Sequence, residues 1–399
     1  MKIKVLVINL GWEQQPLIDE LLKLEYELYG ITNDNSNNLL TTGFKEVHVV
    51  DYRDLDRIYQ IALKIRPNAV ISDQCDYSHY AQAYLCERLN LNGPSLRQAQ
   101  VSSNKYIQRK IAQKNGINVP HFELATSLAE AKEIVNNIGL PVIIKPIDNR
   151  GSFGISKINS VEDIKEAYYN ALVNSHSRFI LIEKFIEGYE ITVDGYCFNG
   201  KPKSISVALK SKEGLKSQVS MDIKYPADIP SSVYEKALLN NELVANALGY
   251  TFGMIHSEYI INDRNEIFLV ESANRGGGVF TSELIVPKVS GVNILNLYID
   301  DVLGINSNID LTNVIQRNQV ILKFFSFKNG RVKKIQGLDI VSNSTGVLAC
   351  RLNIKVGDNI KSIENDGSRH GFIIYSSLGN IREEVAGIIN KINITYYND

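Results

Sequence analysis

The sequence predicts a multidomain fold that combines an α/β layer with α+β units. The chain has 399 residues, and a single hydrophobic core seldom extends beyond about 250 to 300 residues, so two or three domains are expected. The first hundred residues alternate short apolar runs with helical patterns, as in an open α/β sheet. The later part carries apolar or alternating runs separated by turn signals, which is typical of antiparallel hairpins.

The N-terminal region reads as alternating strands and helices. The apolar run IKVLVI (3–8) is typical of a buried parallel strand, and a turn at Gly11 and a helix with Pro16 near its start follow it. Further strands are expected at 27–32, 46–50 and 68–72, and helices at 53–65 and 77–90. The first turn, NLGWEQ, lacks GxGxxG spacing, so a scaffold or substrate-side domain is favoured over a dinucleotide site.

The pattern changes from about residue 104. A helix that ends at Gly116 and a second helix at 127–138 precede an apolar strand that ends at Lys145. Antiparallel strands are then expected at 179–186, 189–198, 254–263 and 266–274. From about residue 311 the tail carries further apolar runs and a final helix, at 319–327, 330–338, 346–354, 370–377 and 381–392.

Composition excludes several functional classes. The 43 Lys and Arg residues nearly balance the 44 Asp and Glu residues, and no long basic block occurs, so nucleic acid is not an expected partner. No stretch approaches the roughly 18 apolar residues of a membrane span, and the N-terminal apolar run is too short for a signal peptide. Scattered cysteines without a CxxC pair indicate a reducing, cytoplasmic setting and no structural zinc. These cysteines are Cys75, Cys86, Cys197 and Cys350.

The segment VIIKPIDNRGSFGISKI (142–158) places a lysine at a strand end, before a glycine-bearing loop. Lys145 needs an anion because removing an ammonium group from water costs several kcal/mol. That anion is either a local carboxylate such as Asp148 or the phosphates of a nucleotide. In the second case the loop 149–154 would close over the phosphates, with Gly151 and Gly154 letting backbone N–H groups approach. The segment alone leaves both interpretations open.

A hinge-like segment follows in ILIEKFIEGYEITVDGY (180–196). One strand ends at residues 183–186, and Glu190 follows across a glycine turn. The hinge would offer backbone N–H and C=O groups to an adenine edge, while Glu190 would accept hydrogen bonds from ribose hydroxyls. A hairpin with solvated charges is the alternative.

A third segment, HSEYIINDRNEIFLVESANRGGG (256–278), carries two carboxylates on runs that a turn separates. A hairpin would place Glu258 beside Glu271, and two close carboxylates repel unless a cation lies between them. Mg²⁺ held by two carboxylates and substrate phosphates suits this arrangement. Arg275 and Gly276–Gly278 follow, where a guanidinium would clamp an acyl phosphate or carboxylate. Two surface carboxylates on opposite faces would not explain the arginine and the glycines.

Together these segments resemble the ATP-grasp superfamily, the fold of biotin carboxylase, D-alanine–D-alanine ligase and the carboxylate–amine ligases. The resemblance covers the whole chain. It implies an N-terminal Rossmann-like pre-ATP-grasp domain (1–103), an ATP-grasp domain (104–310) with a lid subdomain at about 120–190, and a small C-terminal α+β domain (311–399). The C-terminal runs are similar to those of L-amino-acid-ligase-like and biotin-carboxylase-like members.

The same resemblance assigns roles to individual residues. Two lysines would contact the nucleotide, the glycine loop would form the lid over the triphosphate, and the hinge and a glutamate would hold adenine and ribose. These residues are Lys105, Lys145, Gly151, Ser152, Phe153, Gly154, Glu183, Lys184, Phe185, Ile186 and Glu190. Glu258 and Glu271 match the metal-binding pair. Many members read E-x-N at the second of these, whereas Asn274 stands one place later here and is the expected third ligand.

The resemblance implies a reaction in which a carboxylate attacks the γ-phosphate of ATP and an amine then displaces phosphate from the acyl phosphate. ATP and Mg²⁺, or Mn²⁺ in its place, would be the cofactors, and a carboxylate and an amine, amino acids among them, the substrates. A homodimer is an assembly such an enzyme can form. Arg275, Lys145 and Arg369 would act in catalysis, and His256 would pack or support rather than act as a base. A purine-type ligase acting on formate, bicarbonate or a ribotide, or a nucleotide-binding sensor, are the alternatives.

Substrate choice has no readable code in the sequence. It is expected to lie in loops of the first domain, in the segment 209–230 and in the C-terminal sheet. In SDQCDYSH (72–79), Asp73 and Asp76 are expected either to contact substrate or to cap the following helix, the second being at least as well supported.

Overall fold

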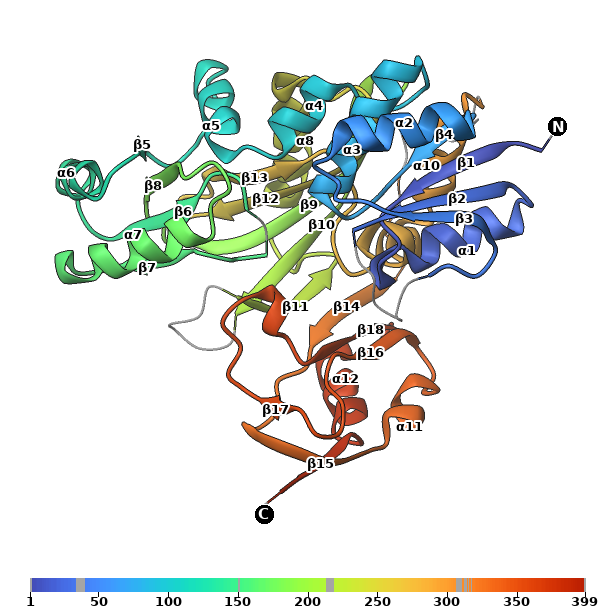
Figure 1. Ribbon diagram of the computed structural model, residues 1–399. Helices are drawn as coiled ribbons and strands as arrows, with labels where there is room; N and C mark the ends of the chain where they lie inside the picture. Colours follow the sequence, from blue (N-terminus) through green and yellow to red (C-terminus); the bar gives the residue numbers. More distant parts are fainter. Residues whose placement is uncertain are drawn as a thin grey trace.

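The computed structural model describes residues 2–33, 40–149, 151–212, 219–305, 311, 314, 316 and 318–397. The described strands form four sheets, of four, eight, three and four strands. Figure 1 shows the N-terminal elements (blue) and a small sheet with its two helices (green) on opposite sides of the eight-stranded sheet, and the C-terminal elements (orange and red) below them. The expected mixed α/β and α+β class is confirmed.

The N-terminal region forms a parallel sheet in the order β3-β2-β1-β4. Its central strand, β1, has four fully buried residues, as the apolar run predicts. The strand β4 leads directly into α3, so residues 72–76 lie at a carboxyl edge of the sheet, where α/β folds place their ligand-binding residues. The elements are β1 (Lys4–Ile8), α1 (Gln15–Lys23), β2 (Glu27–Thr32), β3 (Phe44–Val49), α2 (Leu55–Ile65), β4 (Ala69–Ile71), α3 (Asp76–Leu89) and α4 (Leu96–Ser102).

A small antiparallel sheet, here called the lid sheet, has the order β5-β8-β6-β7. Alternate residues such as Ile144 and Ile182 pack into one core with α6 and α7. Lys145 and Glu183 are odd-numbered neighbours of these residues, so the alternation of a strand turns them to the opposite face. The elements are α5 (Lys105–Lys114), β5 (Phe122–Ala125), α6 (Leu128–Ile138), β6 (Val142–Pro146), β7 (Ser156–Ile158), α7 (Ile164–Val173) and β8 (Ile180–Lys184).

The eight-stranded sheet, here called the large sheet, has the order β13-β12-β9-β10-β11-β14-β18-β16. Val244 and Ala245 of α8 pack in one core with Val193 of β9 and Tyr259 of β12, while α10 packs against the first domain's Val5 and Ile71. The elements are β9 (Tyr189–Phe198), β10 (Lys201–Lys212), β11 (Ser220–Tyr225), α8 (Ser231–Leu248), β12 (Gly253–Ile261), β13 (Ile267–Ala273), α9 (Val286–Ser290) and α10 (Ile294–Leu303).

The large sheet continues across residue 311, where the sequence suggested a domain boundary. β14 pairs with β11 from Tyr225↔Val320 to Asp222↔Lys323, and β18 and β16 extend the sheet beyond it. A three-stranded sheet, β17-β15-β19, stands apart at the C-terminal end. The elements are β14 (Gln319–Phe324), β15 (Gly330–Gln336), α11 (Leu338–Ser342), β16 (Val347–Leu352), β17 (Asn359–Ile360), β18 (Gly371–Ser377), α12 (Ile381–Ile389) and β19 (Asn393–Tyr396).

Across the described ranges, no helix combines the length and the apolarity that a membrane crossing requires.

Candidate active site

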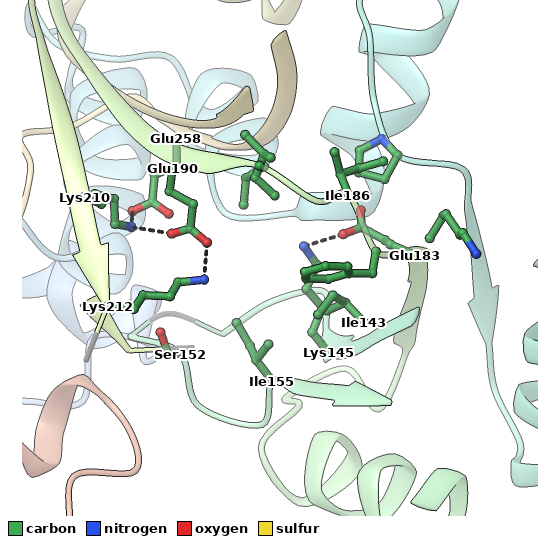
Figure 2. A pocket seen from close by; sticks show the side chains of 16 residues that line it. Ile143, Lys145, Ser152, Ile155, Glu183, Ile186, Glu190, Lys210, Lys212 and Glu258 are labelled. Carbon is green, nitrogen blue, oxygen red and sulfur yellow. Dashed lines mark hydrogen bonds and ion pairs between the residues drawn. The ribbon is translucent and has the colours of Figure 1, made fainter. Parts of the chain in front are cut away.

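A cavity, here called the first cavity, lies between the lid sheet and the large sheet. Figure 2 shows two groups of charged side chains on opposite sides of it, Lys145 with Glu183 and the group formed by Lys210, Lys212, Glu190 and Glu258. Apolar walls that carry a few charged groups are typical of small-molecule sites. The apolar lining includes Ile143, Ile155, Ile186, Ile260 and Val270.

Lys145 does have a carboxylate partner, but this partner is Glu183. Nζ of Lys145 lies 2.6 Å from Oε2 of Glu183, and Nε of Arg109 lies 2.6 Å from Oε1 of the same carboxylate. The suggested partner Asp148 instead accepts hydrogen bonds from Ser175 and from the His176 and Ser177 amides. Glu183, expected in an adenine hinge, therefore has a side chain that binds two buried cations.

The three buried charges perturb one another. Burial lowers the pKa of Lys145, and the charge of Glu183 opposes this effect without cancelling it. Burial raises the pKa of Glu183, but Arg109 and Lys145 outweigh burial, and the net result is a lowered pKa. The carboxylate is therefore ionised, and the lysine is easier to deprotonate than a lysine in water.

The glycine loop is built as a tight, left-handed turn. Gly151, Ser152 and Gly154 have φ values of 66°, 62° and 74°, a region that favours glycine. At Gly154 a Cβ atom would lie 2.8 Å from Cβ of Asn174, so a side chain there has no room. The carbonyl of Gly151 accepts a hydrogen bond of 3.1 Å from the amide of Asp366, which ties the loop to the C-terminal region. Phe153 is 37% exposed.

The hinge residues are partly engaged by the lid sheet. The Lys184 amide donates to the carbonyl of His121 and the Phe185 amide donates to that of Pro141. The Lys184 ammonium donates to the Gly139 and Leu140 carbonyls. The Lys184 amide is therefore taken by a neighbouring chain segment, and Ile186 lines the first cavity directly.

Glu190 lies on the large-sheet side of the first cavity, held by two lysines of β10. Its carboxylate is 2.5 Å from Nζ of Lys212 and 3.7 Å from Nζ of Lys210. Lys210 also lies 3.0 Å from Glu258. Neither lysine was predicted as a site residue, although both fall in the segment 209–230, of which residues 213–218 lie outside the described part.

Glu258 and Glu271 stand directly opposite each other in the register of β12 and β13, as the hairpin predicted. Each carboxylate has a lysine beside it: Lys210 at 3.0 Å from Glu258, and Lys105 at 2.9 Å from Glu271. Burial raises the pKa of Glu258, but Lys210, together with His256 and Lys105, outweighs this effect, and the pKa falls to about 2. Each carboxylate is thus paired with an ammonium group, and Glu258 stays ionised at any physiological pH.

Asn274 does not join this pair. Its amide donates to the carbonyls of Phe252 and Met254 and accepts from Gln98, and its backbone N–H donates to Ser102. The residue is buried to 1% exposure. An amide with this many partners fixes the chain after β13, and the expectation that it is a third metal ligand has no support in its position.

Arg275 joins the large sheet to the first domain. Its guanidinium grips Asp76 through Nε at 2.6 Å and Nη2 at 3.1 Å, and Nη1 donates to the carbonyl of Gly276. Gly276 in turn donates its amide to Asp73, and a Cβ at Gly276 would lie 2.6 Å from that carboxylate. Neither aspartate caps α3, whose N-cap is Cys75, so the capping interpretation was wrong.

A second cavity lies where all three parts of the chain meet. Glu258 and Lys210 line it as well as the first cavity. Arg369 reaches it from the C-terminal region and lies 3.0 Å from Asp366, while its Nε has no hydrogen-bond partner among the described residues. His256 supports the rim, with Nδ1 at 2.7 Å from Asp194. The apolar lining is Trp12, Ile223, Val279, Leu322, Phe324 and Phe372.

Two family models match the chain. The model described as an ATP-grasp domain matches residues 138–283. This range contains β6, β7 and β8 of the lid sheet, the hinge, and the carboxylates of Glu258 and Glu271. The chain carries an ATP-grasp domain. A second model, L-amino acid ligase C-terminal domain 2, matches residues 323–378. The superfamily that the sequence resembled is thereby confirmed.

Relatives of this ATP-grasp protein include an L-arginine-specific L-amino acid ligase of Bacillus subtilis, 23% identical over 344 residues, covering 84% of this chain and 81% of the relative. A D-alanine–D-alanine ligase of Phocaeicola vulgatus is 28% identical over 180 residues, covering 42% of this chain and 53% of the relative. The crystal structure of an L-amino acid ligase from Bacillus licheniformis matches with a TM-score of 0.87, 19% identity and full coverage of both chains. This structural match shows a shared fold.

The carboxylates of the ATP-grasp domain fit a magnesium ion that has substrate oxygens as further ligands. Glu258 and Glu271 lie opposite each other in the strand register, and the described residues contain no cluster of three or more His, Cys, Asp or Glu side chains that would enclose a metal. Mg²⁺ is commonly held by one or two carboxylates together with phosphates and water. The donor set therefore suits Mg²⁺ that arrives with a nucleotide.

Proposed function

We propose that the protein is an ATP-dependent carboxylate–amine ligase. A carboxylate oxygen attacks the γ-phosphorus of ATP, the bond to the β–γ bridging oxygen breaks, and ADP leaves. The amine nitrogen then attacks the carbonyl carbon of the acyl phosphate, inorganic phosphate leaves, and the nitrogen gives up a proton. The products are an amide, ADP and phosphate.

The observation that carries this proposal is the shared wall of the two cavities. Glu258 and Lys210 line both, so a nucleotide in the first cavity would bring its terminal phosphate to the border of the second. A ligase needs this arrangement because the acceptor oxygen must approach the phosphorus directly.

Most charged groups of the site have a role in this scheme. Lys145, Lys105 and the loop 151–154 would bind the phosphates, and the hinge and Glu190 would bind adenine and ribose. Glu258 and Glu271 would hold Mg²⁺, or Mn²⁺ in its place. When bound, the ion neutralises charge that develops on the transferring phosphoryl group. Arg275, fixed by Asp76, would stabilise the acyl phosphate.

The second cavity supports a carboxylate substrate with an apolar side chain. Trp12, Phe280 and Phe372 form one aromatic cluster, with ring centroids 5.5 to 5.9 Å apart. Arg369 offers a buried guanidinium on the same cavity. Small apolar carboxylates, amino acids among them, match this combination of a buried guanidinium and an apolar wall.

Hydroxylamine in place of the amine tests the proposal. A panel of apolar amino acids and other carboxylates is incubated with MgATP and hydroxylamine, and ADP, AMP and hydroxamate are quantified. ADP with a stoichiometric hydroxamate is the expected result. AMP and pyrophosphate would overturn the acyl-phosphate route, whereas ADP without hydroxamate from any carboxylate would favour a purine-type substrate. Nucleotide binding without turnover would favour a sensor.

A further inference from the structure

We propose that Arg109 is a positioning residue that leaves the charge of Lys145 available to the nucleotide phosphates. The inference rests on the proposed function, because it assumes that Lys145 binds phosphate. Arg109 acts through Glu183 and does not line the first cavity.

Arg109 is completely buried, with a side-chain exposure of 0%. It reaches from α5 to both sheets: Nε donates to Glu183 of β8 at 2.6 Å, and Nη2 donates to the carbonyl of Val270 of β13 at 2.6 Å. Val270 precedes Glu271, one of the two facing carboxylates. The guanidinium therefore holds the strand that carries Glu183 next to the strand that carries Glu271.

The charges explain why an arginine is needed at this position. Glu183 carries one negative charge, and its two oxygens are shared between Arg109 and Lys145. With Arg109 present and Lys145 protonated, the three side chains carry a net charge of plus one. Without Arg109, Glu183 and Lys145 would form a neutral pair, and a buried lysine that is neutralised by its own carboxylate attracts an incoming phosphate weakly.

Guanidinium is the suitable group for this task. It stays protonated in any protein environment and binds a carboxylate and a carbonyl from one plane. A lysine at position 109 would keep the charge but lose the planar pair of N–H groups that binds Glu183 and the Val270 carbonyl. Substitutions at position 109 can therefore separate the effect of the charge from the effect of the shape of the side chain.

The experiment measures MgATP and adenosine binding by calorimetry in the full chain. The variants are Arg109→Met, Arg109→Lys and the double variant Arg109→Met with Glu183→Gln, which restores a net charge of plus one. Lys110→Met, on the exposed side of the same helix, is the matched control, and Lys145→Met tests the assumption beneath the proposal. Thermal unfolding confirms that each variant is folded.

Arg109→Met is expected to weaken MgATP binding at least about tenfold and to change adenosine binding less than about twofold, since adenosine carries no phosphate charge. The double variant is expected to recover MgATP binding to within about threefold of wild type, and Arg109→Lys to stay in the same range. If Arg109→Met does not fold, MgATP and adenosine binding are compared in the double variant and in Arg109→Lys instead.

Three results would overturn the proposal. Equal losses of affinity for MgATP and for adenosine, with no recovery in the double variant, would show that Arg109 only stabilises the structure. Unchanged MgATP binding in Arg109→Met, with binding lost in Lys145→Met, would remove the role of Arg109 and keep the proposed function. Unchanged MgATP binding in Lys145→Met would overturn both the role of Arg109 and the phosphate-binding role of Lys145 in the proposed function.

Discussion

Arg275 grips Asp76 across 199 residues of sequence, with Nε 2.6 Å from Oδ1 and Nη2 3.1 Å from Oδ2. Burial lowers the pKa of Arg275, but the charge of Asp76 outweighs it and raises the pKa above its ordinary value. The first domain thus fixes a cation four residues after Glu271. A change in the N-terminal region can therefore alter the position of Arg275, a residue of the proposed reaction centre, without touching residues 138–283, which match the ATP-grasp model.

Arg275→Lys is expected to reduce turnover at least about tenfold while MgATP affinity stays within about threefold, because lysine keeps the charge but loses the planar fork. Steady-state rates and calorimetric dissociation constants check this. Arg264→Lys, in the exposed turn between β12 and β13, is the control. Wild-type turnover in Arg275→Lys would place the arginine outside the reaction centre.

Lys145→Met is expected to weaken MgATP binding at least about tenfold through loss of a buried charge near the phosphates. The variant should nevertheless fold, because Arg109 still neutralises Glu183. Its free energy of unfolding should fall by less than the roughly 3 to 5 kcal/mol that removal of one partner from a simple buried pair costs. Calorimetry and denaturant unfolding measure the two effects, with the exposed Lys165→Met as control.

Glu258→Gln and Glu271→Gln should each retain nucleotide binding, raise the Mg²⁺ concentration needed for half-maximal rate, and lower turnover at least about a hundredfold, by loss of a charged metal ligand. A Mg²⁺ titration at saturating ATP is the measurement. Glu266→Gln, exposed in the same hairpin turn, should behave as wild type. Full activity of Glu258→Gln or of Glu271→Gln at limiting Mg²⁺ would exclude a metal site between β12 and β13.

His79 should make the protein less stable in mild acid. Burial lowers its pKa to about 4, and neither ring nitrogen has a hydrogen-bond partner among the described residues. Between pH about 6.5 and 4 the unfolded chain therefore binds a proton that the folded chain does not, and the free energy of unfolding falls by up to roughly 3 kcal/mol as pH drops.

His79→Leu removes this titration and should flatten the stability curve over the same pH range. Urea unfolding at several pH values, with the exposed His121→Gln as control, measures the slope. An unchanged slope in His79→Leu would show that other groups cause the acid sensitivity.

Local sequence patterns predicted several elements well. The runs at 27–32 and 189–198 have the same ends as β2 and β9. The turn between the expected strands 254–263 and 266–274 sets the register that places Glu258 opposite Glu271. These features depend on residues that are near one another in sequence. The 18-residue helix α8 was not predicted, because its pattern of apolar positions is weak.

The partners of the site residues could not be predicted in the same way. Glu183 binds Lys145 from another strand of the lid sheet, and Asp76 binds Arg275 from α3 of the N-terminal region. Lys210 projects from a long strand without any local motif. Such pairs depend on how sheets and domains pack, which residue type and spacing do not encode.

The pairing of β11 with β14 makes the ATP-grasp region dependent on the tail of the chain. A truncation after residue 310 would remove the partner strand of Asp222–Tyr225 and leave a row of unpaired N–H and C=O groups. Such an edge can pair with another chain and promotes aggregation. The ATP-grasp region therefore cannot be transferred to another protein or shortened at residue 310 unless another strand pairs with β11.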